Sequence, residues 1–339
     1  MYDPTTSRRA FLRHSTTLTT LTTLTALFAL GGHRLATAQP IAGSLRILCS
    51  GPAGSIPDII ARRYAEQLAG RFAGGAVVDN RVGAAGQIAV GALKQASPDG
   101  TTILLAQGAI ATVYPYLYAK LAYDPAVDLK PVSMAVETTL GLAVGPGVPD
   151  SVVTLRDLVD WTRRNPARAN YGSPGIGTLP HLLGAVFFRE AQVESQHVAY
   201  QGGPPAIVDL MGGRLSVLIL PEGLLRQHHA TGKLRVLATS GATRSAYMPE
   251  VATFVEQGFP DVVMREWFAF FLPGGTPANV VETTSQSIRQ SAAHGPLITT
   301  LGEAGMVAGA STPTALADRI AVEQRYWQKV MRTTGIRAE

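Results

Sequence analysis

Residues 45–58 of this 339-residue chain read Leu45-Arg46-Ile47-Leu48-Cys49-Ser50-Gly51-Pro52-Ala53-Gly54-Ser55-Ile56-Pro57-Asp58. Residues 45–50 predict a buried strand and residues 51–55 a turn, after which apolar residues recur at helical spacing: Ile59, Ile60, Tyr64, Leu68 and Phe72. Pro57 and Asp58 are typical of a first helical turn. Strand, turn and helix in this order form the repeating unit of a parallel sheet covered by helices, so the stretch predicts an α/β fold.

The same alternation continues along the chain. Further strands are predicted at residues 77–78, 101–106, 131–144, 169–173, 197–200, 215–220, 234–240 and 267–272. Helices are predicted at residues 83–96, 154–164, 179–191, 204–211, 278–293 and 313–331. Thr154 and Asp157 form a variant of the capping box at the start of one of these helices.

A segment rich in Gly and Pro separates two series of this alternation. Gly145-Pro146-Gly147-Val148-Pro149 follows the extended run 131–144, and strands and helices then begin to alternate afresh. This pattern indicates a crossing between two lobes, each with its own core. We expect residues 39–140 and 240–339 to form lobe 1 and residues 141–239 to form lobe 2, with crossings near Leu140 and Ser240 that serve as a hinge.

The N-terminal segment has the pattern of a twin-arginine export signal. Ser7-Arg8-Arg9-Ala10-Phe11-Leu12 precedes an uncharged stretch, and Ala36-Thr37-Ala38 supplies the small residues that a signal peptidase requires. We expect residues 1–38 to be cleaved and the mature chain to begin near Gln39 in the periplasm. A transmembrane anchor is the alternative, but the apolar core is short and interrupted by Thr.

Charge and cysteine content exclude several classes of function. The formal net charge is +5, and removing Arg8, Arg9, Arg13, Arg34 and Asp3 with the signal lowers it by 3 to +2. No basic run in the mature chain is longer than two residues, so we expect no nucleic-acid partner. Cys49 is the single cysteine, which rules out an intrachain disulfide, and we interpret it as a buried strand thiol rather than a nucleophile.

Three glycine-rich turns lie between a predicted strand and a predicted helix, at residues 51–55, 83–86 and 172–178. Glycine lets the backbone turn sharply and approach a ligand, and the helix N-terminus behind each turn offers unpaired N–H groups and a partial positive charge. Such turns also have purely structural uses in α/β proteins. Three of them in one chain favour an anion site.

Known catalytic and cofactor motifs are missing from the sequence. Neither G-x-G-x-x-G with its acidic partner nor a Walker sequence occurs, so we expect no cofactor. Ser173 lacks the glycine that a nucleophile elbow needs two residues before the serine. His181 and the neighbours His228 and His229 have no metal-binding spacing, so we expect no metal and no catalytic residues.

The turns coincide with segments that resemble the Bug or TctC family, the extracytoplasmic solute receptors of tripartite tricarboxylate transporters. The resemblance covers residues 44–339, and the segments that carry it are Pro52–Arg62, Asp79–Gly86, Pro98-Asp99-Gly100, Tyr123-Asp124-Pro125, Gly175–Leu182, His197–Gly203, Met248–Gly258 and Pro273–Pro277. The sequence departs from the family pattern at Ser55, Ala85, Ala199 and Ser216, and each change is either neutral or a change in the shape of the pocket.

The resemblance implies a type 2 periplasmic-binding-protein fold of two α/β lobes that close on a small carboxylate. It implies a monomeric receptor that delivers this ligand to transporter membrane subunits; a sensor subunit for a signalling partner and, with less support, an enzyme on the same scaffold are the alternatives. The identity of the ligand stays open. We expect ligand contacts, largely through backbone N–H groups, at Ala53, Gly54, Ser55, Asp58, Gly83, Ala84, Ala85, Gly86, Ser173, Gly175, Gly177, Thr178, His181, Tyr200 and Gly202.

Overall fold

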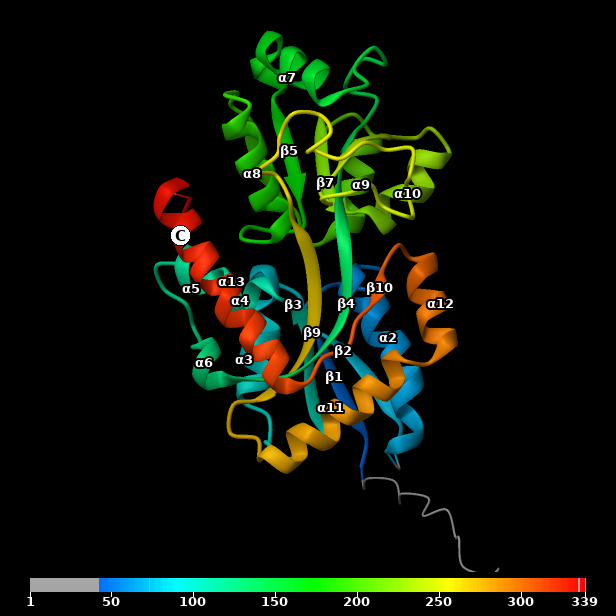
Figure 1. Cartoon of the computed structure of the whole chain (residues 1–339), viewed down its shortest axis with the longest axis vertical. Coiled ribbons are helices and arrows are strands. Elements are labelled where there is room, and N and C mark those ends of the chain that lie inside the picture. The colour runs from blue at the N-terminus through cyan, green and yellow to red at the C-terminus, as the bar shows by residue number, and fades with distance from the viewer. Residues whose placement is uncertain (1–42, 73, 335, 339) are drawn as a thin grey trace, which may run out of the picture. The chain divides into compact units, whose positions relative to one another are not determined.

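A computed structural model of the chain describes residues 43–72, 74–334 and 336–338 (Figure 1). The expected export signal and its cleavage site near Gln39 lie outside the described residues. Within those ranges, no helix has both the length and the apolar character needed to cross a bilayer.

Lobe 1 is built on three parallel strands, β1 (Leu45–Cys49), β2 (Ala76–Asn80) and β3 (Thr102–Gln107), with β9 (Arg265–Pro273) antiparallel beside β3. One face of this sheet packs against α2 (Ile56–Leu68), α11 (Ala278–Ala292) and α12 (Gly295–Glu303). The other face packs against α3 (Gln87–Lys94), α4 (Ala109–Thr112), α5 (Tyr114–Leu117) and α13 (Pro313–Thr334). The shorter elements are η1 (Ala69–Arg71), η2 (Ala84–Gly86), α6 (Pro125–Asp128) and β10 (Val307–Ala308).

Lobe 2 repeats this plan with the parallel strands β5 (Asn170–Ser173), β6 (Gln196–Ala199) and β7 (Val217–Pro221). Buried residues of α7 (Leu155–Arg164) and α8 (Leu179–Glu190) cover one face, and those of α9 (Gly203–Met211) and α10 (Glu222–Ala230) cover the other. Two further elements are η3 (Pro166–Arg168) and β8 (Arg235–Thr239). The predicted capping box of α7 is confirmed, because the Thr154 hydroxyl accepts from the Asp157 N–H while the Asp157 carboxylate accepts from the Thr154 N–H.

The long strand β4 (Leu129–Val144) belongs to both lobes (Figure 1). Residues 129–139 pair with β9, and residues 140–144 pair with β7 and β8. The strands therefore form one continuous sheet in the order β2-β1-β3-β9-β4-β7-β5-β6. β4 changes its pairing partner from β9 to β7 between Thr139 and Leu140, the place where the sequence suggested a crossing between lobes.

The return path differs from the prediction, which assigned residues from 240 onward to lobe 1. Residues 240–264 pack against lobe 2: the Phe254 N–H donates to the Thr239 carbonyl at 3.1 Å, and the centroids of the Phe254 and Phe187 rings lie 5.3 Å apart, edge to face. Phe254 is fully buried there, which accounts for the position of this loop. Tyr247 of this segment also reaches lobe 1, where its hydroxyl donates to the Met306 carbonyl at 3.2 Å. The chain pairs with the lobe 1 part of β4 again from Arg265.

The predicted alternation of strands and helices is confirmed, whereas α4, α5, α6, α10 and α12 lie outside the predicted helix ranges. The short helix α12 begins with Gly295 and Pro296, which are signals for a turn in a sequence. Cys49 lies fully buried in β1, and burial raises the pKa of its thiol to about 11, as expected for a strand thiol of no catalytic use.

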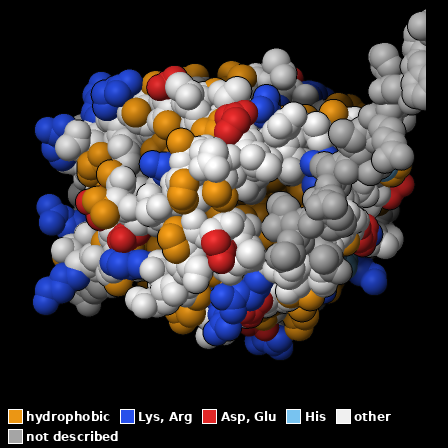
Figure 2. Space-filling model, turned by 90° about the horizontal axis from the view of Figure 1, so that it is seen from below, with side chains coloured by type: hydrophobic (Ala, Val, Ile, Leu, Met, Phe, Trp, Pro, Cys, Tyr) orange, Lys and Arg blue, Asp and Glu red, His pale blue; other side chains and the backbone are white. Residues whose placement is uncertain are grey.

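Charged side chains are mixed on the face shown in Figure 2, where Lys and Arg are separated by acidic, apolar and uncharged residues. Many exposed charges form local pairs, such as Arg63 with Glu66 and Arg244 with Glu256. Exposed pairs contribute little to stability, typically about 0–1 kcal/mol each. The stability of the fold therefore comes mainly from the buried apolar faces of the sheet.

Candidate ligand-binding site

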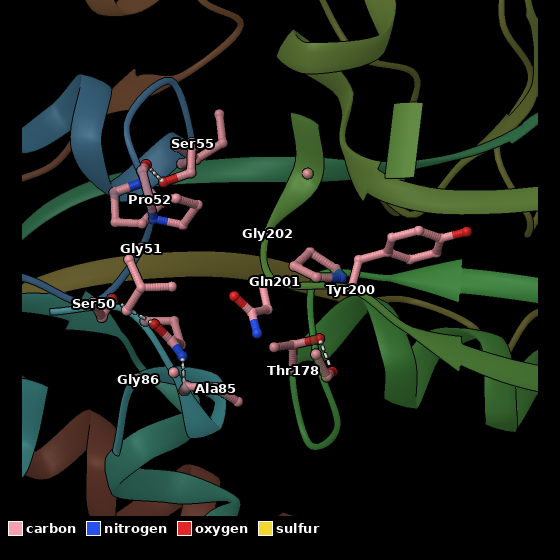
Figure 3. A pocket seen from close by; sticks show the side chains of 18 of the residues that line it. Ser50, Gly51, Pro52, Ser55, Ala85, Gly86, Thr178, Tyr200, Gln201 and Gly202 are labelled. Carbon is pink, nitrogen blue, oxygen red and sulfur yellow. Dashed lines mark hydrogen bonds between the residues drawn. The ribbon is translucent and has the colours of Figure 1, made fainter. Parts of the chain in front are cut away.

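A pocket with a cavity volume of about 490 Å³ lies between the two lobes (Figure 3). It opens at the carboxyl ends of the parallel strands of both lobes, where clefts of α/β proteins commonly hold ligands. The lining residues are Ser50, Gly51, Pro52, Ser55, Ile56, Pro57, Val82, Gly83, Ala84, Ala85, Gly86, Gln87, Gln107, Tyr118, Lys120, Pro174, Gly175, Ile176, Thr178, Ala199, Tyr200, Gln201, Gly202, Gly203, Leu220, Pro221, Leu224, Glu266 and Phe268.

Four helices begin at the wall of this pocket. The N-cap residues of α2, α3, α8 and α9 are Ser55, Gly86, Thr178 and Gly202, and all four line the cavity. None of these N-cap residues provides a side-chain hydrogen bond to the first helical turn. The N-terminal N–H groups and the positive ends of four helix dipoles therefore meet at one cavity, an arrangement that suits an anion.

The hydroxyl groups of the lining are occupied as donors. Ser50 donates to Gln107 Oε1 at 2.9 Å, Ser55 to the Pro52 carbonyl at 2.6 Å and Thr178 to the Gly175 carbonyl at 2.8 Å. The Tyr118 and Tyr200 hydroxyls donate to the Ile176 carbonyl and the Asp209 carboxylate. Donation to a bound anion consequently falls to backbone N–H groups and to amide and amino side chains such as Gln201, which Figure 3 shows directed into the space between the lobes.

The second glycine-rich turn is held in a left-handed conformation. Ala84 and Ala85 have φ values of 44° and 50°, which cost about 1 kcal/mol or more per non-glycine residue. The Ala85 carbonyl accepts hydrogen bonds from Gln107 Nε2 at 2.6 Å and from the Tyr114 hydroxyl at 2.7 Å. These bonds hold the turn in place and draw its carbonyl towards Gln107 and Tyr114.

The first glycine-rich turn is tied to β2 by a buried polar network. Asp58 accepts from the Gly54 N–H at 3.0 Å, from Asn80 Nδ2 at 2.9 Å and from Arg62 Nε at 3.1 Å. Asn80 Nδ2 also donates to the Gly51 carbonyl at 2.8 Å. Burial alone would raise the pKa of Asp58, but the bonds from Arg62, Gly54 and Asn80 together lower it, so the side chain is an anion that organises the turn.

The structure brings nine of the expected ligand-contact residues to the pocket wall: Ser55, Gly83, Ala84, Ala85, Gly86, Gly175, Thr178, Tyr200 and Gly202. The Tyr200 ring points away from the cavity in Figure 3, towards its bond with Asp209. Six expected residues lie outside the lining: Ala53, Gly54, Asp58, Ser173, Gly177 and His181. For Gly54 and Asp58 the reason is the network just described, which uses the Gly54 N–H and both carboxylate oxygens within the protein.

Ser173, Gly177 and His181 form a second internal cluster with His197. The Gly177 N–H, expected to face the ligand, donates instead to His181 Nδ1 at 3.1 Å, and the Ser173 hydroxyl contacts His197 Nε2 at 2.8 Å. The imidazole rings of His181 and His197 lie 4.1 Å apart beside Tyr171. Burial lowers the pKa of His181 to about 4 and that of His197 to about 3, so both rings are neutral at pH 7.

The four departures from the family pattern occupy different environments. Ser55 and Ala199 line the pocket, and Ala85 lines it with a methyl group that a Cβ at Gly175 would approach to 3.3 Å. Ser216 lies outside the lining, where its N–H donates to Asn170 Oδ1 and its hydroxyl donates to the Arg168 carbonyl. Three of the departures thus line the pocket, whereas Ser216, the residue before β7, is hydrogen-bonded to Asn170 of β5 and to Arg168 of η3.

Sequence reasoning missed several lining side chains, including Gln107, Lys120, Gln201 and Glu266. Glu266 had a visible signal, because it is a carboxyl group next to an otherwise apolar strand. Gln107 and Lys120 lie outside the glycine-rich turns, and no pattern in the sequence marked them as pocket residues. Across the described residues, no three His, Cys, Asp or Glu side chains come together in a way that could hold a metal ion.

Two α/β lobes joined by crossing strands, with a pocket between them, define the type 2 periplasmic-binding-protein fold. A solved structure of a periplasmic transporter aligns with a TM-score of 0.82 at 28% identity, covering 88% of this chain and 99% of that chain. Rpa4515 of R. palustris, solved with adipate, aligns with a TM-score of 0.82 at 27% identity, covering 88% of this chain and 98% of that chain.

The chain belongs to the TctC family, the tripartite tricarboxylate transporter family receptors, whose family model matches residues 60–336. The UPF0065 protein in the tcbD-tcbE intergenic region of Pseudomonas sp. (strain P51) is 31% identical over 281 residues, which is 83% of each chain. Protein BugT of Bordetella pertussis is 29% identical over 295 residues, covering 87% of this chain and 90% of that protein. The resemblance seen in the sequence is thereby confirmed, and this is a family of solute-binding receptors rather than of enzymes.

Proposed function

We propose that this protein is a periplasmic receptor that binds a small organic carboxylate between its lobes and delivers it to the membrane subunits of a tripartite transporter. The observation that carries the proposal is the meeting of four helix N-termini, none capped by its own N-cap side chain, at one cavity. The likeness to Rpa4515, solved with adipate, also supports a carboxylate.

Physical chemistry favours a carboxylate as the anion. Two helices belong to each lobe, so a ligand with a carboxylate can draw N–H donors from both lobes at once. The apolar wall of the pocket, which includes Ile56, Leu220, Leu224 and Phe268, suits a hydrocarbon segment attached to the carboxylate. A cavity of about 490 Å³ is within the usual range for small-molecule sites.

We further infer that the protein acts as a monomeric carrier without catalysis. The Ser173 and His197 pair resembles a nucleophile with its base, but Ser173 is fully buried and lies outside the pocket lining. A neutral imidazole whose pKa is far below 7 is also a poor general base at neutral pH. The two lobes are proposed to close on the ligand about the crossings in β4 and in the segment that leads into β9.

The test is calorimetric titration of the mature protein with mono-, di- and tricarboxylates, aromatic acids and amino acids. The informative variant is Ala84→Asp, because Ala84 is exposed in the left-handed second turn, a conformation that Asp and Asn tolerate. Its carboxylate should compete with the ligand for the helix N-termini and abolish binding. Ala84→Asn has nearly the same shape without the charge and should retain binding; equal loss in both variants, or no loss in either, would contradict an anion site at this turn.

A further inference from the structure

Glu266 is a buried carboxyl group in the pocket wall that the receptor function above does not use. It lies in β9 opposite Thr138 of β4, and only 3% of it is exposed. Strand alternation places its neighbour Trp267 on the opposite face, where the indole donates to Glu323 of α13. Glu266 and Phe268 therefore share the face that lines the pocket.

Among the described residues, no side chain or N–H group donates a hydrogen bond to the Glu266 carboxyl. The hydroxyls of the pocket lining already donate to other acceptors, and Gln107 Nε2 donates to the Ala85 carbonyl. Buried carboxyl groups normally have a partner, because removing one from water without compensation is costly. A carboxyl on a ligand-pocket wall that has no partner within the protein is open to a ligand group that takes the place of water there.

The charges of the pocket indicate what that partner is. The helix N-termini of both lobes already serve a ligand carboxylate, so a second ligand carboxylate against an ionised Glu266 would place like charges together in a poorly solvated site, and only a protonated Glu266 could receive it. An ammonium group there would instead form a charge-assisted hydrogen bond, the strongest use of a buried carboxylate. Lys120, the basic side chain in the lining, is exposed at the edge of the pocket.

We propose that Glu266 is a specificity-determining residue that accepts a hydrogen bond from an ammonium group of the ligand, so that the receptor selects amino carboxylates over dicarboxylates of similar length. This inference rests on the proposed carboxylate-receptor function and names the class of its ligand. Without ligand, burial raises the pKa of the Glu266 carboxyl to about 8. An ammonium group that enters the pocket lowers this pKa by Coulomb attraction, and the carboxyl then releases its proton to the solvent.

The experiment compares matched ligands by calorimetry at pH 7: adipate with 6-aminohexanoate, and glutarate with glutamate. In the wild type, the amino member of at least one pair should bind about tenfold or more tightly than its dicarboxylate. Glu266→Gln keeps the size of the side chain and should remove this preference. Glu66→Gln, a matched change at an exposed residue of α2, should leave the preference intact.

A second readout separates direct contact from a merely structural role. Titration in buffers of different ionisation enthalpy should detect proton release on binding of the amino ligand by the wild type and none by Glu266→Gln. Tyr118 and Tyr200 cannot supply this proton at pH 7, because their pKa values are raised. Lys120→Met should still release a proton when the amino ligand binds. This result would exclude Lys120, the other charged side chain of the lining, as the source of the proton.

The outcomes distinguish the two proposals. If carboxylates bind but Glu266→Gln leaves the ratio of the two affinities unchanged, the inference on Glu266 is wrong and the receptor function stands. If the wild type binds the dicarboxylates more tightly and Glu266→Gln, whose amide also donates, retains that preference, Glu266 is a protonated donor and the ammonium proposal is overturned. If no carboxylate or amino acid in the full panel binds the wild type, both proposals fail.

Discussion

The hydroxyl of Tyr118 in lobe 1 donates a hydrogen bond of 3.0 Å to the backbone carbonyl of Ile176 in lobe 2. Two glycines of lobe 2 lie so close to lobe 1 that a side chain would not fit at either position. A Cβ at Gly177 would come within 2.5 Å of Leu117 Cδ2, and a Cβ at Gly202 within 2.7 Å of Pro52 Cγ. The lobes are therefore in contact on more than one side of the pocket, as in a closed receptor.

Gly177→Ala should weaken ligand binding by about tenfold or more while the protein still folds. The added methyl group would clash with Leu117 and hold the lobes apart. Alanine would also be strained at this position, because the backbone there is left-handed with φ of 82°. Gly232→Ala is the control, because Gly232 has φ of 71° and nothing within 4 Å of the added Cβ. Calorimetry of both variants provides the measurement; equal affinity losses would assign the effect to backbone strain rather than to the contact between lobes.

A saturating carboxylate should shift the unliganded ensemble towards the compact form. A ligand that contacts both lobes binds the closed form more tightly than the open one, so it must move the equilibrium and raise the melting temperature. Solution scattering should record a smaller radius of gyration with ligand than without it, and Gly177→Ala should lose this decrease. Confirmed binding without any decrease would mean that the ligand contacts one lobe or that the free receptor is already closed.

The buried His181 and His197 should contribute a loss of stability as the pH is lowered below about 6.5, opposed by Glu266 and Glu222, whose pKa values burial raises to about 8 and about 7. His181 and His197 have folded-state pKa values of about 4 and about 3, whereas both titrate near 6.5 when unfolded. Between these values the unfolded chain binds more protons than the folded chain, so acid favours unfolding. After allowance for partial exposure of His197, we expect the two histidines together to contribute a loss on the order of 2–3 kcal/mol from pH 7 to pH 5.

His197→Gln provides the check on this assignment. Glutamine can still hydrogen-bond the Ser173 hydroxyl but does not titrate. Urea unfolding of this variant should therefore show a smaller loss, or a larger gain, of unfolding free energy from pH 7 to pH 5 than the wild type. An unchanged slope in a folded His197→Gln protein would mean that other groups cause the acid sensitivity.

Asp58→Asn should reduce both stability and ligand affinity although Asp58 lies outside the pocket lining. The change removes a buried charge that holds Arg62, Asn80 and the Gly54 N–H, and a loss of about 1–3 kcal/mol is expected. Because the folded-state pKa of Asp58 is lowered, the wild-type advantage is present above the unfolded-state value near 3.8 and disappears as the pH falls through the folded-state pKa.

Denaturant melts of Asp58→Asn at pH 7 and pH 3 measure this difference. The control is Asp79→Asn, which removes a carboxylate that pairs at the surface with Arg81. The Asp79→Asn change should alter the free energy of unfolding by no more than about 1 kcal/mol. A similar loss in both variants would argue against a special role for the turn network.

Replacing Arg8 and Arg9 together with lysine should leave the precursor in the cytoplasm, because the twin-arginine route depends on the arginine pair. The motivation is Ser7-Arg8-Arg9-Ala10-Phe11-Leu12 and the small residues at 36–38. Fractionation and immunoblotting of the two forms provide the measurement. A normal periplasmic yield of the lysine variant would contradict export by the twin-arginine route.

Much of the fold was predictable because its signals are local. Residues 45–68 show the pattern of a buried strand, a turn and an amphipathic helix within one window, and the structure contains β1 and α2 there. The capping box of α7 has both partners within three residues. The return path through residues 240–264 was not predictable, since it depends on Phe254 meeting Phe187, which is distant in the chain.

The sequence by itself determined the α/β class, the family and the three turns that carry helix N-termini, because glycine spacing and hydrophobic periodicity act over a few residues. Only the tertiary structure decided which groups of those turns face the cavity. The Gly177 N–H donates a hydrogen bond to His181, and the Asp58 carboxylate accepts hydrogen bonds within lobe 1. The Glu266 carboxyl, in contrast, lines the pocket. Hydrogen-bond partners and burial depend on residues brought together from distant parts of the chain, and a linear pattern does not specify these long-range contacts.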